Sequence, residues 1–254
     1  MKKNEKYNDL EVVTIQCGAR YHDIFIRPQS SDRFVLGQIF FDKSYDISKL
    51  KRFDDLRRFY FNILDSGKKP FVIDAGANIG ASSLYFSLMM PQSIVIAIEP
   101  DDDNYLLLKK NTQQRSITSI NAALTSDGHN SKLIDIGNSE WGFVTSPNEI
   151  GDEDAPTNNM IRGTTVPEIL MDHLDCVPFL VKVDIEGAEA EVFSGNADWV
   201  KAIPLIIIEP HDWLFPNSGG MVNFFRELTS INFDIEVNGE NVFIINNDPK
   251  VWNV

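Results

Sequence analysis

The sequence of 254 residues contains only two cysteines, Cys17 and Cys176, which lie far apart and have no metal-ligand pattern beside them. We therefore expect neither a disulfide framework nor a zinc site. Long apolar runs are also missing: no stretch approaches the length of a membrane span, and the first residues, MKKNEKYNDLEVV, lack the apolar core of a signal peptide. These absences predict a soluble, cytoplasmic protein with no membrane partner.

Positive charge is scarce as well. There are 23 basic residues against 37 acidic ones, for a formal net charge of -14. A polyphosphate ligand would have to bind against the overall field, and no basic stripe interrupts the acidic composition. We therefore expect no nucleic-acid partner. Hydrophobic residues at 43% and charged residues at 24% are ordinary values for a globular domain.

From Phe71 onward, short β-rich runs alternate with segments of helical periodicity. This alternation is typical of β-α-β units and predicts an α/β fold with a mostly parallel sheet covered on both faces. The expected strands are residues 70–74, 93–99, 116–124, 179–184 and 204–209, with helices over 80–90, 101–114, 188–200 and 219–230. The runs FDIEV and VFIIN, joined by NGEN, predict a hairpin that closes one edge of the sheet.

Two regions differ from this core, which we place at residues 70–254. Residues 1–69 predict a strand pair around VVTIQC and YHDIFIRP and then a helix from Ser48 to Asp65, so we expect an N-terminal cap in front of the core. Residues 137–160 are polar, acidic and rich in turn formers. They predict a mobile surface loop, which could be a functional cover or simply disordered.

The stretch DAGANIG, residues 74–80, places an aspartate and two glycines at the end of a buried strand. Glycines there permit a tight turn into a helix and a close approach of a ligand to the backbone. A dinucleotide site would require glycine where Asn78 stands, and this difference argues against NAD or FAD. A plain tight turn with an incidental helix cap is the alternative interpretation.

The acid at the tip of the first strand favours a different ligand. A carboxylate at Asp74 would repel a pyrophosphate but suits a cation, and S-adenosylmethionine carries a sulfonium and an α-ammonium group. The next strand ends in Glu99, the position of the acid that binds the ribose hydroxyls in open α/β sheets.

The chain resembles the FkbM-type methyltransferases in FVIDAGANIGASSLYF, IAIEPDDDNYLLLKKN, LVKVDIEGAEAEVFSG and IIIEPH, and upstream in IRPQSSDRFVLGQIFFDKSY. The resemblance extends from about Ile26 to His211. It implies a Rossmann-like, S-adenosylmethionine-dependent enzyme of class I, whose seven-stranded sheet has its first and fourth strands side by side. The cofactor residues that it implies are Asp74, Gly76, Ala77, Asn78 and Gly80 for the methionine part, Glu99 and Pro100 for the ribose, Ala122 near the adenine, and Asp184 across the crevice.

Candidates for the chemistry must lie at the strand tips. They are Lys182, Asp184, Glu186, Glu209 and His211. Asp184 is the foremost of them, and His211 is a candidate base for a hydroxyl proton or else a solvated loop residue. Lys182 could instead pair with Glu209 across adjacent strands. Glu189 is most simply a partner of a helix dipole.

A metal site is conceivable at Asp184, Glu186 and either Glu209 or His211, but the spacing specifies no metal and we assign none. Trp141, Trp213 and Phe215 could stack on a sugar ring or be ordinary core or rim aromatics. His22, His129 and His173 have no supporting context.

These patterns together predict an S-adenosylmethionine-dependent O-methyltransferase. Its acceptor would be a hydroxyl of a small molecule, most plausibly a sugar, a glycoside or a polyketide-like metabolite, and that class comes from the resemblance alone. One alternative is a catalytically silent module of the same fold that binds a glycan or a protein. Another is a nucleic-acid methyltransferase, against which the charge argues. A homo-oligomer is left open.

Overall fold

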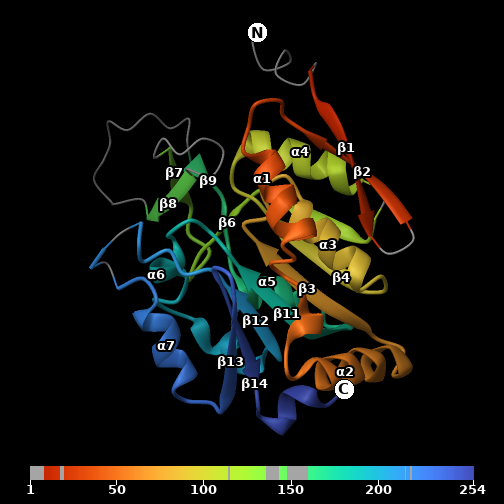
Figure 1. Ribbon diagram of the computed structural model, residues 1–254. Coiled ribbons are helices and arrows are strands. Elements are labelled where there is room, and N and C mark those ends of the chain that lie inside the picture. Colours follow the sequence, from red (N-terminus) through yellow and green to blue (C-terminus); the bar gives the residue numbers. More distant parts are fainter. Residues whose placement is uncertain are drawn as a thin grey trace.

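The computed structural model describes residues 9–17, 20–113, 115–135, 143–147, 160–214, 216–217 and 219–254. At its centre lies a seven-stranded sheet of order β13-β14-β12-β11-β3-β4-β5 (Figure 1). Its strands are β3 (Lys69–Ala75), β4 (Ile94–Ile98), β5 (Ile117–Ile120), β11 (Cys176–Val183), β12 (Leu205–Ile208), β13 (Phe233–Asn238) and β14 (Asn241–Asn246). Strand β14 pairs antiparallel with β12 and β13, and the other pairs are parallel.

This arrangement confirms the predicted mixed α/β fold, the neighbouring first and fourth strands, and the closing hairpin. Strands β3 and β12 are almost continuous apolar runs because both of their faces are buried. Alternate residues enter two different cores: Val72 joins one apolar cluster and its neighbour Ile73 joins the other.

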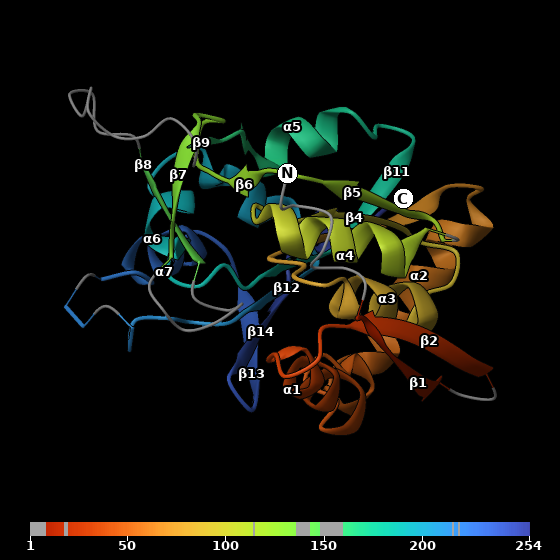
Figure 2. The same cartoon turned by 90° about the horizontal axis from the view of Figure 1, so that it is seen from above.

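Helices cover both faces of the sheet, as Figure 2 shows from above. One cluster includes α2 (Phe53–Asp65), α3 (Ala81–Met89) and part of α4 (Asp102–Thr112), and the other includes α5 (Val166–Met171), α6 (Glu189–Val192) and α7 (Val222–Leu228). Among the described residues, no helix is long and apolar enough to cross a membrane.

Two expected elements are divided. The strand expected over 116–124 is β5 and a separate β6 (Ala123–Leu124), which pairs with β10 (Gly163–Thr164) outside the main sheet. Between them, the side chain of Asn121 donates to the carbonyls of Glu99 and Pro100 at 3.1 and 3.2 Å, which ties the chain to the end of β4. The helix expected over 188–200 ends at Val192, and a separate 3-10 helix (Ala197–Ala202) begins after Asn196, which has a left-handed conformation.

The N-terminal strand pair is confirmed as β1 (Glu11–Cys17) and β2 (Arg20–Ile26). Helix α2 begins later than expected, after a 3-10 turn (Ile47–Lys49). Two further elements were not predicted, α1 (Asp32–Leu36) and the π-helical turn (Gly37–Phe41) that follows it. Ile24 and Ile26 are buried in the same cluster as α3. The N-terminal segment therefore shares the core of the sheet.

The N-terminal segment also contacts the C-terminal hairpin. The backbone N–H of Lys51 donates to Glu236 at 2.7 Å, and the side chain of Asn238 donates to the carbonyls of Lys43 and Ser44 at 3.1 and 3.2 Å. These bonds hold the first and last parts of the described chain together at one end of the sheet.

Part of the predicted loop at 137–160 is a strand. Strand β7 (Ser131–Asp135) pairs antiparallel with β8 (Phe143–Pro147) and with β9 (Met160–Ile161). Residues 136–142 and 148–159 lie outside the described residues.

Candidate active site

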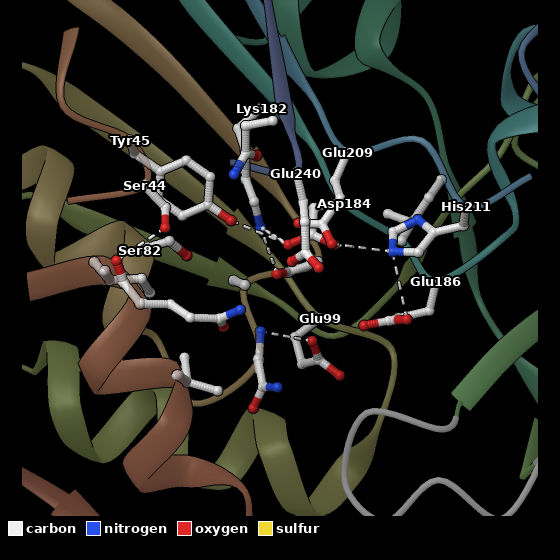
Figure 3. A pocket seen from close by; sticks show the side chains of 18 of the residues that line it. Ser44, Tyr45, Ser82, Glu99, Lys182, Asp184, Glu186, Glu209, His211 and Glu240 are labelled. Atoms are coloured by element: carbon white, nitrogen blue, oxygen red, sulfur yellow. Dashed lines mark hydrogen bonds and ion pairs between the residues drawn. The ribbon is translucent and has the colours of Figure 1, made fainter. Parts of the chain in front are cut away.

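A cavity of about 570 Å³ opens at the carboxyl ends of β3, β4, β11 and β12 (Figure 3). This volume is in the range of small-molecule sites. Its lining includes Gly76, Ala77, Asn78, Glu99, Pro100, Ala122, Lys182, Asp184, Glu186, Glu209 and His211. The structure thus brings together all five predicted catalytic residues and most of the predicted cofactor residues, whereas Asp74 and Gly80 lie behind the cavity wall.

The glycine turn after β3 is shaped by contacts within the protein. Gly76 has φ of 78°, and a Cβ there would lie 1.6 Å from the carbonyl oxygen of Asp184. Gly80 has φ of 88°, and its Cβ would lie 2.7 Å from Leu108. We expected these glycines to permit a tight turn and the close approach of a ligand. The positive φ at both positions confirms the tight turn, and at Gly76 the backbone of Asp184 already leaves no room for a side chain.

Asp74 is fully buried beneath this turn. Its carboxylate accepts hydrogen bonds from Ser82 and Ser83 at 2.7 and 2.5 Å and lies 3.1 Å from Lys182 Nζ. Asp74 therefore does not line the cavity, and its direct contact with the methionine part of a cofactor stays a prediction. Asp74 instead positions Lys182 and the first turn of α3.

Lys182 connects the two central strands. Its Nζ donates to the carbonyl of Gly76 at 2.8 Å and lies 3.1 Å from Asp74 and 3.3 Å from Asp184. Burial lowers the pKa of this lysine, but the two carboxylates outweigh burial and raise the pKa. Our alternative that Lys182 pairs with Glu209 is wrong, because the ion-pair partners of Lys182 are Asp74 and Asp184; on the side of β12, Lys182 lies opposite Ile207.

Glu99 lies at the other end of the cavity, after β4, and is 5% exposed. Its carboxylate accepts hydrogen bonds from the backbone N–H groups of Asn78 at 2.8 Å and Asp101 at 3.0 Å. Burial raises the pKa of Glu99 to about 7. A carboxylate fixed beside the glycine turn in this way could accept hydrogen bonds from a diol.

Facing Glu99 across the cavity is a cluster of one imidazole and three carboxylates, which we call the acidic cluster: Asp184, Glu186, Glu209 and His211 (Figure 3). His211 Nε2 lies 3.5 Å from Glu186, 3.6 Å from Glu209 and 3.8 Å from Asp184. Asp184 follows β11, and Glu209 follows β12. Glu186 reaches the cluster from a left-handed backbone conformation, with φ of 55°.

The imidazole is held from behind by Glu189. His211 Nδ1 lies 2.8 Å from Glu189 Oε1, and both side chains are 2% exposed. Glu189 begins α6, as a helix-dipole partner would, but its carboxylate is used to orient His211. No local sequence pattern indicates this pairing, because it joins residues on different segments.

The charge state of His211 disagrees with the predicted role of base. Burial lowers the pKa of His211, but Glu189, Glu209 and Asp184 together raise it to about 11. The imidazole is therefore protonated near neutral pH in this structure and has no free lone pair for a proton. Burial and the neighbouring Asp184 raise the pKa of Glu186 to about 8.

The N-terminal segment and the hairpin supply walls that the sequence did not suggest. The hydroxyl of the buried Tyr45 donates to Asp184 Oδ2 at 3.1 Å, and Glu240 lines the mouth. Trp213 lines the cavity as well, with 69% of its surface exposed. Trp141 and Phe215, the other aromatics considered for stacking, lie outside the described residues.

The chain is similar in sequence to known methyltransferases. The methyltransferase FkbM domain matches residues 74–231. Methyltransferase 1 of Beauveria bassiana is 28% identical over 183 residues, which are 65% of this chain and 67% of that protein. Methyltransferase sdnD of Sordaria araneosa is 26% identical over 196 residues, 64% of this chain and 68% of that protein.

A solved structure, the SAH-bound methyltransferase PaMTH1 of Podospora anserina, is 12% identical to this chain and has a TM-score of 0.41, covering 79% of this chain and 84% of the other. The FkbM match itself extends over more than half of the chain and contains the glycine turn, Glu99 and the acidic cluster. The chain therefore belongs to the FkbM methyltransferase domain family.

Proposed function

We propose that this protein transfers a methyl group from S-adenosylmethionine to a hydroxyl of a small molecule, a sugar, a glycoside or a polyketide-like metabolite. The observation that carries the proposal is that one cavity has two differently built ends, Glu99 with the glycine turn at one and the acidic cluster at the other. Such a cavity can hold two reactants against each other, which is the main requirement for a methyl transfer.

The residues of the first end fit the cofactor. Glu99 would accept hydrogen bonds from the ribose hydroxyls, and Ala122 would lie against the adenine. The acidic walls suit the positive charges of the sulfonium and ammonium groups. Asp74 would act indirectly, by holding Lys182 against the Gly76 carbonyl. When bound, S-adenosylmethionine supplies an activated methyl group.

The second end would receive the acceptor. Asp184 is held by Tyr45 and Lys182, so its carboxylate has a defined orientation. Glu209 lines the cavity with 18% of its side chain exposed, and we assign it as the acceptor of the hydroxyl proton. Glu209 would take the proton that the hydroxyl loses as the new O–C bond forms and the C–S bond of the cofactor breaks. His211, held by Glu189, fixes the cluster.

The test is release of S-adenosylhomocysteine when the protein is supplied with S-adenosylmethionine and a panel of monosaccharides, glycosides, polyketide lactones and matched amines. We expect a hydroxylated acceptor to gain the mass of one methyl group. Glu99→Ala should weaken cofactor binding, and Asp198→Ala, whose side chain is 88% exposed away from the cavity, serves as the control.

Transfer to amines alone would contradict O-methylation. Saturable cofactor binding with no transfer to any acceptor would instead support the silent binding module.

A further inference from the structure

The acidic cluster has the composition and geometry of a metal site. Ligand atoms of Asp184, Glu186 and His211 all lie within 4.8 Å of one another. An ion with bonds of about 2.1–2.4 Å separates its ligands by roughly 3–4.8 Å, so these three side chains could bind one ion without large movements.

The buried imidazole points to a ligand independently of the carboxylates. His211 is 3% exposed, and its Nδ1 is already engaged by Glu189. Its Nε2 faces the cluster, and among the described residues its nearest carboxylate oxygens lie at 3.5 Å or more, too far for a good hydrogen bond. A carboxylate behind Nδ1 is the usual arrangement of a histidine that binds a metal through Nε2, because it fixes both the tautomer and the ring.

The other side chains leave the right atoms available. Tyr45 and Lys182 both contact Oδ2 of Asp184, at 3.1 and 3.3 Å, so Oδ1 remains on the side of His211. Glu186 has φ of 55°, a conformation that a glutamate rarely adopts, and it lines the cavity. Strain of this kind is typical of functional sites.

We propose that Asp184, Glu186 and His211 bind a divalent cation, with Glu189 as the residue that orients the imidazole. On binding, the ion would replace the proton that His211 carries at Nε2 in the metal-free protein. Two carboxylates with one imidazole form a set between the oxygen ligands of Mg²⁺ and the nitrogen-rich ligands of Zn²⁺, and Mn²⁺ matches it best. Glu209 lies next to the three ligands and would contact a water or an acceptor oxygen on the ion.

A role for the ion rests on the proposed function. A cation at this end of the cavity would bind the acceptor hydroxyl and lower the pKa of that hydroxyl, so that its proton passes to Glu209 as the O–C bond forms and the C–S bond breaks. The favoured acceptors would then be those with a second oxygen beside the reacting hydroxyl, such as vicinal diols and α-hydroxy carbonyl compounds, because two adjacent oxygens can chelate one ion.

The test uses the full chain without cofactor and Mn²⁺ alone as the probe. Titration followed by the loss of the electron paramagnetic resonance signal of free Mn²⁺ should show one saturable site. Glu186→Gln and His211→Gln should each weaken binding by about tenfold or more, and Glu189→Gln by about 10–100-fold. Glu191→Gln serves as the matched control, because this glutamate of the same helix binds Ser126 instead, and it should bind Mn²⁺ as the wild type does.

Circular dichroism of each variant distinguishes a lost site from a lost fold, and Glu186 is the safer position because a third of its side chain is exposed. Absence of saturable binding, or equal binding by the wild type and a folded Glu186→Gln variant, would overturn the proposal. Displacement of Mn²⁺ by S-adenosylhomocysteine would also overturn it, since the carboxylates would then belong to the cofactor amine. Mn²⁺ binding without methyl transfer would support the site and contradict the proposed function. Methyl transfer at the full rate by the metal-free protein would contradict the proposed role of the ion in activating the acceptor hydroxyl.

Discussion

The ammonium nitrogen of Lys182 lies 3.1 Å from Oδ1 of Asp74, across the two central strands of the sheet. Both side chains are 1% exposed or less, and the two residues are direct partners in the register of β11 and β3. A charge pair in this position joins the half of the sheet that carries the glycine turn to the half that carries the acidic cluster.

Removal of one partner of this pair should be costly. Asp74→Asn leaves Lys182 with one carboxylate and should lower the free energy of unfolding by about 3–5 kcal/mol, because a buried charge loses much of its compensation. The double variant Asp74→Asn with Lys182→Met should be less destabilised than the sum of the two single variants. Urea unfolding of the four proteins measures this, and strict additivity would contradict the pairing.

The glycine turn offers a test with an internal control. Gly76 and Gly67 have nearly the same φ, 78° and 80°, but a Cβ at Gly67 would meet nothing within 4 Å. Gly67→Ala should therefore cost only the conformational penalty of about 1–2 kcal/mol. Gly76→Ala should cost several times as much, since its Cβ collides with the Asp184 carbonyl. Thermal unfolding measures both, and equal losses would show that the close contact is unimportant.

Cofactor affinity should depend on pH through Glu99. Burial raises the pKa of this carboxyl in the folded protein from an ordinary value near 4.5 to about 7, so below that pH it holds a proton. Ribose hydroxyls donate to the ionised form, and affinity for S-adenosylhomocysteine should rise from pH 5 to pH 7 by up to about tenfold per pH unit and then level off.

Glu99→Gln serves as the control for this titration, because an amide cannot ionise. The difference in pH dependence of affinity between wild type and variant is due to the titration of Glu99. Titration of the acidic cluster and of Asp101, whose backbone N–H donates to Glu99, affects both proteins alike. Parallel pH profiles of the two proteins would argue against Glu99 as a ribose ligand.

Titration of Glu99 should also affect stability, which falls as pH rises, whereas cofactor affinity increases. Between about pH 4.5 and 7 the folded protein binds a proton at Glu99 that the unfolded chain does not, so the contribution of Glu99 to stability falls as pH rises through this window. The unfolding midpoint in urea, measured across this range, should decline less in Glu99→Gln than in the wild type.

Tyr45 should affect turnover more than cofactor binding. Tyr45→Phe removes the hydroxyl that donates to Asp184, a bond to a charged group worth about 1.5–3 kcal/mol, and should lower kcat about tenfold or more. Tyr60→Phe is the control, because the Tyr60 hydroxyl accepts from the backbone of Gln92 and does not line the cavity. Calorimetry with S-adenosylhomocysteine and a methyl-transfer assay separate the two effects, and an unchanged kcat in Tyr45→Phe would contradict the role of the N-terminal segment.

Local patterns were sufficient to predict most of the sheet. The apolar runs, the glycine turn and the acid at each strand tip are encoded within a few residues, so Asp184, Glu209 and Glu99 were placed correctly at one edge. The prediction of one strand over 116–124 was wrong, because the division into β5 and β6 depends on the contacts of Asn121 with the end of β4. The apolar pattern of the sequence does not predict such a contact.

Long-range contacts account for the other errors. The partner of Lys182 depends on strand register, and the protonation of His211 depends on Glu189, 22 residues earlier. The contact of Tyr45 with Asp184 joins residues 139 positions apart. Ion pairs, hydrogen bonds and protonation states of this kind depend on contacts between distant segments of the chain, which local sequence patterns do not predict.

The bonds between Lys43, Ser44 and the side chain of Asn238 also set an order of events during synthesis. A chain leaving the ribosome presents Tyr45 long before the hairpin at residues 233–246 exists, and both segments line the cavity. The mouth of the cavity therefore cannot form completely until nearly the whole described chain has emerged. Until then the cavity lacks the part of its lining that the hairpin supplies.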